Sequence, residues 1–156
     1  MGSSGKGATL AAVREPAAPS GTANRLESGM RPATRRRVLL VEDEDMVRKV
    51  LTRMLVARGF EVHAAASGPE AMAIFDARDA KVFDLLVTDL MLPEGGGLVV
   101  ARYLSEQQPG LRILFVSGYS SADTEGLEPE CYRFLTKPFG SSELIRSIDD
   151  LFQAQP

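Results

Sequence analysis

Val38-Leu39-Leu40-Val41-Glu42-Asp43 is a run of four apolar residues that ends in two carboxylates. A short, continuous apolar run is typical of a β-strand buried on both faces, as in a parallel sheet covered by helices on each side. The carboxylates would then follow the carboxyl end of that strand. The stretch therefore predicts the first strand of a parallel sheet, with acidic side chains at one edge of the sheet.

Alternating patterns continue from this strand to the end of the sequence. Further strands are predicted at residues 61–65, 82–88, 112–116 and 132–136. Helices are predicted after an Asp45 cap, after a capping box of Ser67 and Glu70, over residues 98–107 and from Ser141 onwards. Because strands and helices alternate, we expect an α/β fold with a parallel sheet, right-handed crossovers and helices on both faces.

The segment 120–131 departs from this alternation, because it should hold a helix and carries little sign of one. It contains Gly126 and Pro129, has few apolar residues and shows no helical stripe. We expect this helix to be short, frayed or absent. The alternative is a single helical turn at residues 121–125.

Composition divides the chain into a tail and a body. The tail is rich in Gly, Ala, Ser and Pro and has no sustained apolar period, so we expect a flexible linker over residues 1–36 and one ordered domain over residues 37–154. The net charge is +5 over residues 1–37 and −8 over residues 38–156, which together give the −3 of the chain. An acidic body argues against non-specific nucleic-acid binding.

Several other classes of protein are excluded by what the sequence lacks. Cys131 is the only cysteine, so no internal disulfide forms, and His63 is the only histidine, so a Cys/His metal site is not expected. No run approaches the roughly 18 apolar residues that cross a bilayer, and the start of the chain lacks the apolar core of a secretory signal. We therefore expect a cytoplasmic protein without a membrane span in this segment.

Polar side chains follow four of the predicted strands. Glu42 and Asp43 follow the first strand, Asp89 the third, Ser117 the fourth and Lys137 the fifth. In open parallel sheets the ligand crevice lies beyond the carboxyl ends of the strands, so these side chains should meet there. Three converging carboxylates repel each other, and Mg²⁺ removes that repulsion. A serine hydroxyl and a lysine ammonium are groups that stabilise a phosphoryl group in transfer.

Four segments together resemble the signature segments of the response-regulator receiver domains of two-component signalling. They are Val41-Glu42-Asp43-Glu44, Thr88-Asp89-Leu90-Met91-Leu92-Pro93, Val116-Ser117-Gly118-Tyr119 and Thr136-Lys137-Pro138-Phe139. The resemblance covers about residues 37–153 and implies a flavodoxin-like, doubly wound sheet of five parallel strands in the order 2-1-3-4-5. The third segment is also similar to receivers of hybrid sensor histidine kinases.

The resemblance implies a role for each matching acidic position. Asp89 is the expected phospho-acceptor. Mg²⁺ is expected to bind Asp43, Asp89 and the backbone carbonyl of Met91, with Glu42 acting through a water molecule.

The resemblance also implies roles for residues of the fourth and fifth strands. Lys137 is expected to pair with a phosphoryl oxygen, and Ser117 to hydrogen-bond another and shift on phosphorylation. Phe134 occupies the aromatic switch position, where many members have tyrosine, so a switch here would rest on packing alone. The peptide bond before Pro138 is expected to be cis.

The expected function is that of a receiver that takes a phosphoryl group from a phosphohistidine onto Asp89 and acts as a switch or relay. Its partner would be a histidine kinase or a histidine phosphotransfer protein, and it would catalyse its own phosphorylation and dephosphorylation. No output domain follows the last helix, so we expect no direct DNA binding. We also expect a monomer, because the weak helix signal at residues 120–131 makes dimerisation through that face, as in DNA-binding relatives, less favourable. One alternative is a pseudo-receiver that binds partners without phosphotransfer, and another is an aspartyl-phosphate phosphohydrolase.

The tail offers one clue to the parent protein. Gly5-Lys6-Gly7-Ala8-Thr9-Leu10 is similar to the glycine-rich end of a histidine-kinase ATP-binding domain, which in hybrid kinases is followed by a linker and a receiver. The alternative is an ordinary linker or a cloning tag.

Overall fold

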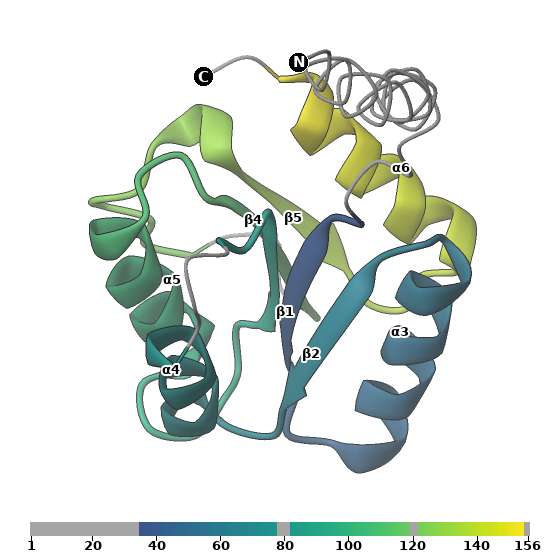
Figure 1. The fold of residues 1–156 in the computed structure, drawn as a ribbon, viewed down its shortest axis with the longest axis horizontal. Coiled ribbons are helices and arrows are strands. Elements are labelled where there is room, and N and C mark those ends of the chain that lie inside the picture. Colours follow the sequence, from purple (N-terminus) through teal and green to yellow (C-terminus); the bar gives the residue numbers. More distant parts are fainter. Residues whose placement is uncertain (1–34, 78–81, 119–121, 155–156) are drawn as a thin grey trace, which may run out of the picture. The chain divides into compact units, whose positions relative to one another are not determined.

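A five-stranded parallel sheet is the centre of the computed structural model, which describes residues 35–77, 82–118 and 122–154. The strands are β1 (Arg37–Val41), β2 (Glu61–Ala65), β3 (Leu85–Asp89), β4 (Arg112–Ser117) and β5 (Tyr132–Thr136). Their order in the sheet is β2-β1-β3-β4-β5, and every pair of neighbours is parallel (Figure 1). The expected α/β fold and strand order are confirmed.

Helices cover both faces of this sheet. They are α3 (Asp45–Ala57), α4 (Gly68–Asp76), α5 (Gly96–Gln107) and α6 (Ser141–Gln153). Helices α4 and α5 lie on one face, and α3 and α6 lie on the other (Figure 1). Alternate residues of β1 serve the two cores: Leu39 and Val41 pack with the α4 and α5 side, whereas Val38 and Leu40 pack with the α3 and α6 side.

The register of the central strands brings the predicted site residues to one edge. Val41 of β1 pairs with Thr88 of β3, so the residues after Val41 leave the sheet beside Asp89. Ser117 of β4 pairs with Thr136 of β5, so the next residue, Lys137, leaves the sheet beside Ser117. The four strand ends therefore converge, because parallel strands share a carboxyl edge.

Some element boundaries differ from the sequence prediction. The third strand begins at Leu85 rather than at residue 82, since Val82 is exposed and Asp84 lies just before the ladder. The Asp84 carboxylate accepts the Arg37 N–H at 2.7 Å, and the Asp84 N–H donates to the Arg37 carbonyl at 2.8 Å. Helix α5 begins at Gly96, two residues before the predicted start. The hydrogen bonds between Asp84 and the Arg37 backbone lie at the end of the sheet opposite the acidic edge.

Residues 122–131 hold no α-helix, in agreement with the expectation for this segment. Their only helical element is a single 3-10 turn, η2 (Pro129–Cys131). Arg102 of α5 donates to the carbonyls of Asp123 and Glu125 at 2.9 and 3.0 Å, and Leu127 is buried in the core. The backbone of this loop is thus held by a side chain from α5 and by the turn hydrogen bonds from Leu127 to Thr124 and from Cys131 to Glu128.

Three sequence predictions fall outside the described residues. They concern the flexible tail at residues 1–34, the motif residue Tyr119 and the start of the possible turn at Ser121. Among the helices that the structure describes, none is long and apolar enough to cross a membrane.

Candidate functional site

Three carboxylates converge where β1 and β3 end. One carboxylate oxygen from each of Glu42, Asp43 and Asp89 lies within 4.8 Å of the others. Glu42 and Asp89 are buried, with exposed fractions of 1% and 7%, whereas Asp43 is exposed. Carboxylates this close repel each other, and the burial of two of them strengthens the repulsion. The cluster can therefore bind a metal ion, which would remove the repulsion.

The ammonium group of Lys137 contacts two carboxylates of this cluster. Its Nζ lies 2.8 Å from Asp89 Oδ2 and 3.1 Å from Glu42 Oε2. The backbone of Lys137 is held as well, because its N–H donates to the Ser117 carbonyl at 2.8 Å. The Lys137–Pro138 peptide bond is cis. The fifth strand thus delivers one ammonium group to the two buried carboxylates.

Burial and neighbouring groups shift the pKa values of Glu42 and Lys137. Burial raises the pKa of Glu42, and the Asp89 carboxylate acts in the same direction, while the Glu44 N–H and Lys137 act against them. For Lys137, burial acts to lower the pKa, but the hydrogen bonds to Asp89 and Glu42 outweigh it and the pKa is raised. Lys137 therefore stays protonated, and its positive charge contacts two of the three carboxyl groups.

The remaining predicted site residues lie around this cluster. Ser117 is buried at the end of β4, and the Met91 N–H donates to Asp89 Oδ1 at 2.8 Å while the Met91 side chain is exposed. Phe134 is half-buried and stacks on Phe115, with ring centroids 5.3 Å apart, and it meets Tyr132 edge to face. Phe134 thus lies in an aromatic group on β4 and β5.

An apolar groove, which the sequence reasoning did not find, adjoins the acidic cluster. It has a volume of about 360 Å³ and is lined by Met46, Val47, Val50, Leu51, Met54, Lys137, Pro138 and Phe139. Met46 and Val50 are 69% and 45% exposed, which is high for large apolar side chains. The sequence did contain a signal for this groove. Helix α3 has more apolar residues than the single face that packs against the sheet can bury, so some of them must be exposed.

Comparison with known proteins identifies the family once this geometry is known. Residues 38–149 match the response regulator receiver domain family. The chain belongs to this family. It is a receiver domain of two-component signalling.

Individual relatives of this receiver domain include both hybrid kinases and single-domain regulators. The chain is 39% identical over 120 residues to the sensor kinase CckA of Brucella abortus, covering 76% of this chain and 13% of the kinase. It is 30% identical to the response regulator receiver protein CpdR of the same organism, covering 76% of this chain and 98% of the regulator.

Solved structures of receivers share the fold. The receiver domain of the hybrid histidine kinase CckA is 34% identical, with a TM-score of 0.62 over 75% of this chain and 99% of the other. A Thermotoga maritima response regulator in complex with Mg²⁺ and BeF is 26% identical, with a TM-score of 0.63 over 74% of this chain and 98% of the other.

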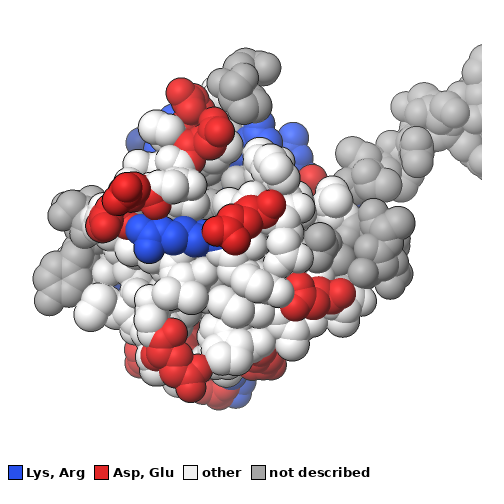
Figure 2. All heavy atoms as spheres, turned by 90° about the vertical axis from the view of Figure 1, so that its left-hand side faces the viewer, with Lys and Arg blue, Asp and Glu red and all other residues white. Residues whose placement is uncertain are grey.

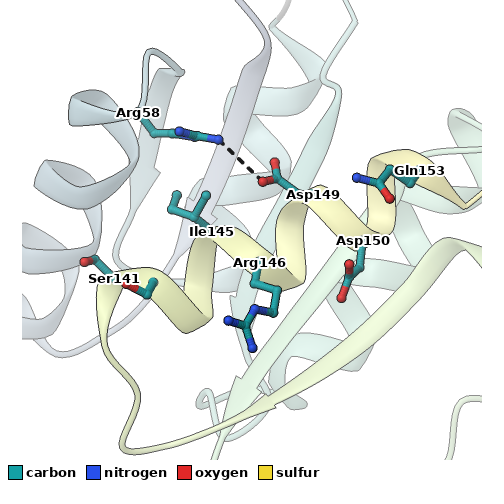
Figure 3. A pocket seen from close by; sticks show the side chains of 8 residues that line it. Arg58, Ser141, Ile145, Arg146, Asp149, Asp150 and Gln153 are labelled. Atoms are coloured by element: carbon teal, nitrogen blue, oxygen red, sulfur yellow. Dashed lines mark hydrogen bonds and ion pairs between the residues drawn. The ribbon is translucent and has the colours of Figure 1, made fainter.

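A second hollow of the receiver domain lies between α3 and α6, away from the acidic cluster. It is lined by Arg58, Ser141, Ser142, Ile145, Arg146, Asp149, Asp150 and Gln153 (Figure 3). Arg58 reaches across it to Asp149, with 3.5 Å between the guanidinium nitrogen and the carboxylate oxygen. Both side chains are about half exposed, and such ion pairs contribute little stability. We assign no binding role to this hollow.

Proposed function

We propose that this receiver domain takes a phosphoryl group from a phosphohistidine onto Asp89 in the presence of Mg²⁺, and acts as a switch or relay. The observation that supports this most directly is the contact of 2.8 Å between Lys137 Nζ and Asp89 Oδ2 inside a cluster of three carboxylates. The carboxylate can act as the nucleophile. The ammonium group beside it can stabilise the negative charge that develops on the phosphoryl group during transfer.

The acidic cluster is suited to Mg²⁺ because its donors are hard carboxylate oxygens. We assign Asp43, Asp89 and the backbone carbonyl of Met91 as direct ligands, with Glu42 acting through water. A bound Mg²⁺ would supply positive charge that balances the charge of the phosphoryl oxygens. One oxygen of Asp89 would attack phosphorus while the bond between phosphorus and the donor histidine nitrogen breaks and the imidazole leaves. The other oxygen, Oδ1, accepts the Met91 N–H at 2.8 Å.

Lys137 and Ser117 are assigned to the phosphoryl oxygens that Mg²⁺ does not hold. Lys137 already contacts Asp89 as a point charge, and its backbone is tied to Ser117. Ser117 would donate its hydroxyl to a phosphoryl oxygen and shift towards it. Ser117 and Phe134 lie on neighbouring strands. We propose that the shift of Ser117 changes how Phe134 packs against Phe115.

We further propose that the receiver spans residues 37–154 as a cytoplasmic monomer, preceded by a linker over residues 1–36. The partner would be a histidine kinase or a histidine phosphotransfer protein, and a hybrid kinase is the proposed parent. Direct DNA binding is not expected.

The surface charge of one face agrees with this expectation. On the face formed by α4 and α5, basic side chains lie between or behind acidic ones and do not gather into a patch (Figure 2).

Mass spectrometry tests the proposed function. The domain is incubated with Mg²⁺ and acetyl phosphate as a small phospho-donor, and we expect a mass gain of one phosphoryl group. Addition of EDTA before the donor should prevent the gain. No gain with Mg²⁺ would favour a pseudo-receiver, and continuous hydrolysis of added phosphate esters without a stable adduct would favour a phosphohydrolase.

The position of the apolar groove favours binding of a protein partner next to the acidic cluster. Lys137 lines the groove and also contacts Asp89 of the cluster. A partner that buries Met46 and Val50 would place its phosphohistidine beside Asp89. A few residues carry most of the binding energy of an interface, and truncating one of them typically costs more than about 1 kcal/mol.

We expect the double substitution Met46→Gln and Val50→Gln to slow phosphotransfer from a phosphorylated histidine phosphotransfer protein by about tenfold or more. Phosphorylation by acetyl phosphate should not change, because the acidic cluster is untouched. The matched control is Val56→Gln, which alters an exposed valine of α3 outside the groove. Equal rates for all three proteins with the protein donor would show that the groove is not the docking site.

A further inference from the structure

Every polar group of Glu42 has a partner within the structure. Its N–H donates to the Ala65 carbonyl at 3.1 Å, Oε1 accepts the Glu44 N–H at 3.1 Å, and Oε2 accepts Lys137 Nζ at 3.1 Å. Its main-chain carbonyl accepts Arg48 Nη1 at 3.0 Å. Three of these partners are backbone groups or belong to the site already described. Arg48 is the one that the proposed function does not use.

Arg48 links the acidic turn to helix α3. Its second guanidinium nitrogen forms a hydrogen bond with Asp45 in the first turn of the helix, while the first reaches back to the Glu42 carbonyl. The side chain is 21% exposed, so the guanidinium is partly shielded from water. A planar guanidinium that bonds two oxygens at once holds both in a defined geometry.

The turn between β1 and α3 needs such a support. Glu44, the N-cap residue of α3, makes no side-chain cap hydrogen bond, so the helix start is not fixed in the usual way. Glu42 and Asp43 are consecutive carboxylates in this turn, and their repulsion from Asp89 would push them apart. The contact from Arg48 fixes the peptide unit between Glu42 and Asp43, which sets the direction of both side chains.

We propose that Arg48 is a positioning residue of the acidic site: it holds the Glu42–Asp43 peptide so that Glu42 and Asp43 face Asp89, and thereby raises the affinity of the site for Mg²⁺. This inference rests on the proposed function, since it assumes that the cluster binds Mg²⁺.

Electrostatics alone predicts the opposite effect of removing Arg48 on Mg²⁺ affinity, so a measurement can separate the two explanations. Arg48 is a cation close to a cation-binding site, so removing its charge would strengthen Mg²⁺ binding if charge were all that mattered. Loss of positioning would weaken binding, because groups that orient metal ligands typically change metal affinity by 10- to 100-fold. The sign of the change therefore separates the two effects.

The experiment measures the dissociation constant of Mg²⁺ by isothermal titration calorimetry for the unsubstituted domain, Arg48→Gln and Lys49→Gln. Lys49 is the matched control: it lies on the same helix, pairs with Asp45 at 3.1 Å and is 65% exposed, and its described contacts do not include Glu42. Both substitutions remove one positive charge. We expect about tenfold weaker binding for Arg48→Gln, and unchanged or slightly tighter binding for Lys49→Gln.

Equal or tighter Mg²⁺ binding by Arg48→Gln, with the unsubstituted domain binding normally, would overturn the role of Arg48 and leave the proposed function intact. Absence of Mg²⁺ binding by the unsubstituted domain would instead contradict the proposed function. Circular dichroism establishes that each variant is folded at the temperature of the titration. Should Arg48→Gln fail to fold, Arg48→Lys replaces it; this variant keeps the charge without the planar fork, so an affinity equal to that of the unsubstituted domain would again overturn the role.

Discussion

Replacing Asp89 with Asn is expected to reduce phosphoryl incorporation to background, the largest loss that we predict for any single substitution in this domain. The amide has nearly the same shape as the carboxylate but no nucleophilic oxygen with which to form an acyl phosphate. It also removes one of the three carboxylates that would hold Mg²⁺. The measurement is the mass gain after incubation with Mg²⁺ and acetyl phosphate.

The matched control for this substitution is Asp149→Asn. Asp149 lies on α6 and forms an ion pair with Arg58 across the α3 and α6 hollow, so its loss removes the same charge away from the acidic cluster. We expect this variant to be phosphorylated like the unsubstituted domain. A full mass gain in Asp89→Asn, with circular dichroism showing a native fold, would mean that another residue accepts the phosphoryl group.

The fold and the candidate site could be predicted from the sequence for the same physical reason. Apolar runs such as residues 38–41 mark strands that are buried on both faces, and parallel strands share one carboxyl edge. Glu42 and Asp43 follow such a run, Asp89 ends another, and Lys137 follows the half-buried strand β5. Their meeting follows from topology and does not require knowledge of side-chain packing. The distances at Lys137 bear out this argument.

Features that depend on side-chain packing could be predicted from the sequence only in part or not at all. The third strand starts late because Asp84 bonds to the Arg37 backbone, a contact between residues 47 positions apart. The groove beside Lys137 depends on which apolar residues of α3 turn away from the core. No sequence pattern predicts the contact of Arg48 with the Glu42 main-chain carbonyl, since any helix can carry an arginine at that position.

The position of the acceptor strand also depends on a close backbone approach at Gly97 in the first turn of α5. A Cβ at this residue would lie 2.2 Å from the Asp89 carbonyl oxygen and 2.8 Å from the Thr88 hydroxyl oxygen. The Gly97 N–H also donates to the Leu90 carbonyl at 3.1 Å, so the helix start is tied to the loop after Asp89. Neither backbone can move away without disturbing the buried end of β3.

We expect Gly97→Ala to lower the free energy of unfolding by about 3 kcal/mol, in spite of the better helix propensity of alanine, because overpacking against fixed backbone is costly. Urea denaturation measures this change, and phosphorylation of Asp89 should fall with it because the clash displaces the acceptor strand. The control is Gly118→Ala: a Cβ there meets nothing within 4 Å, so we expect a change within about 0.5 kcal/mol. Equal stability of the two variants would show that α5 can shift away from β3, and that Gly97 does not fix the position of Asp89.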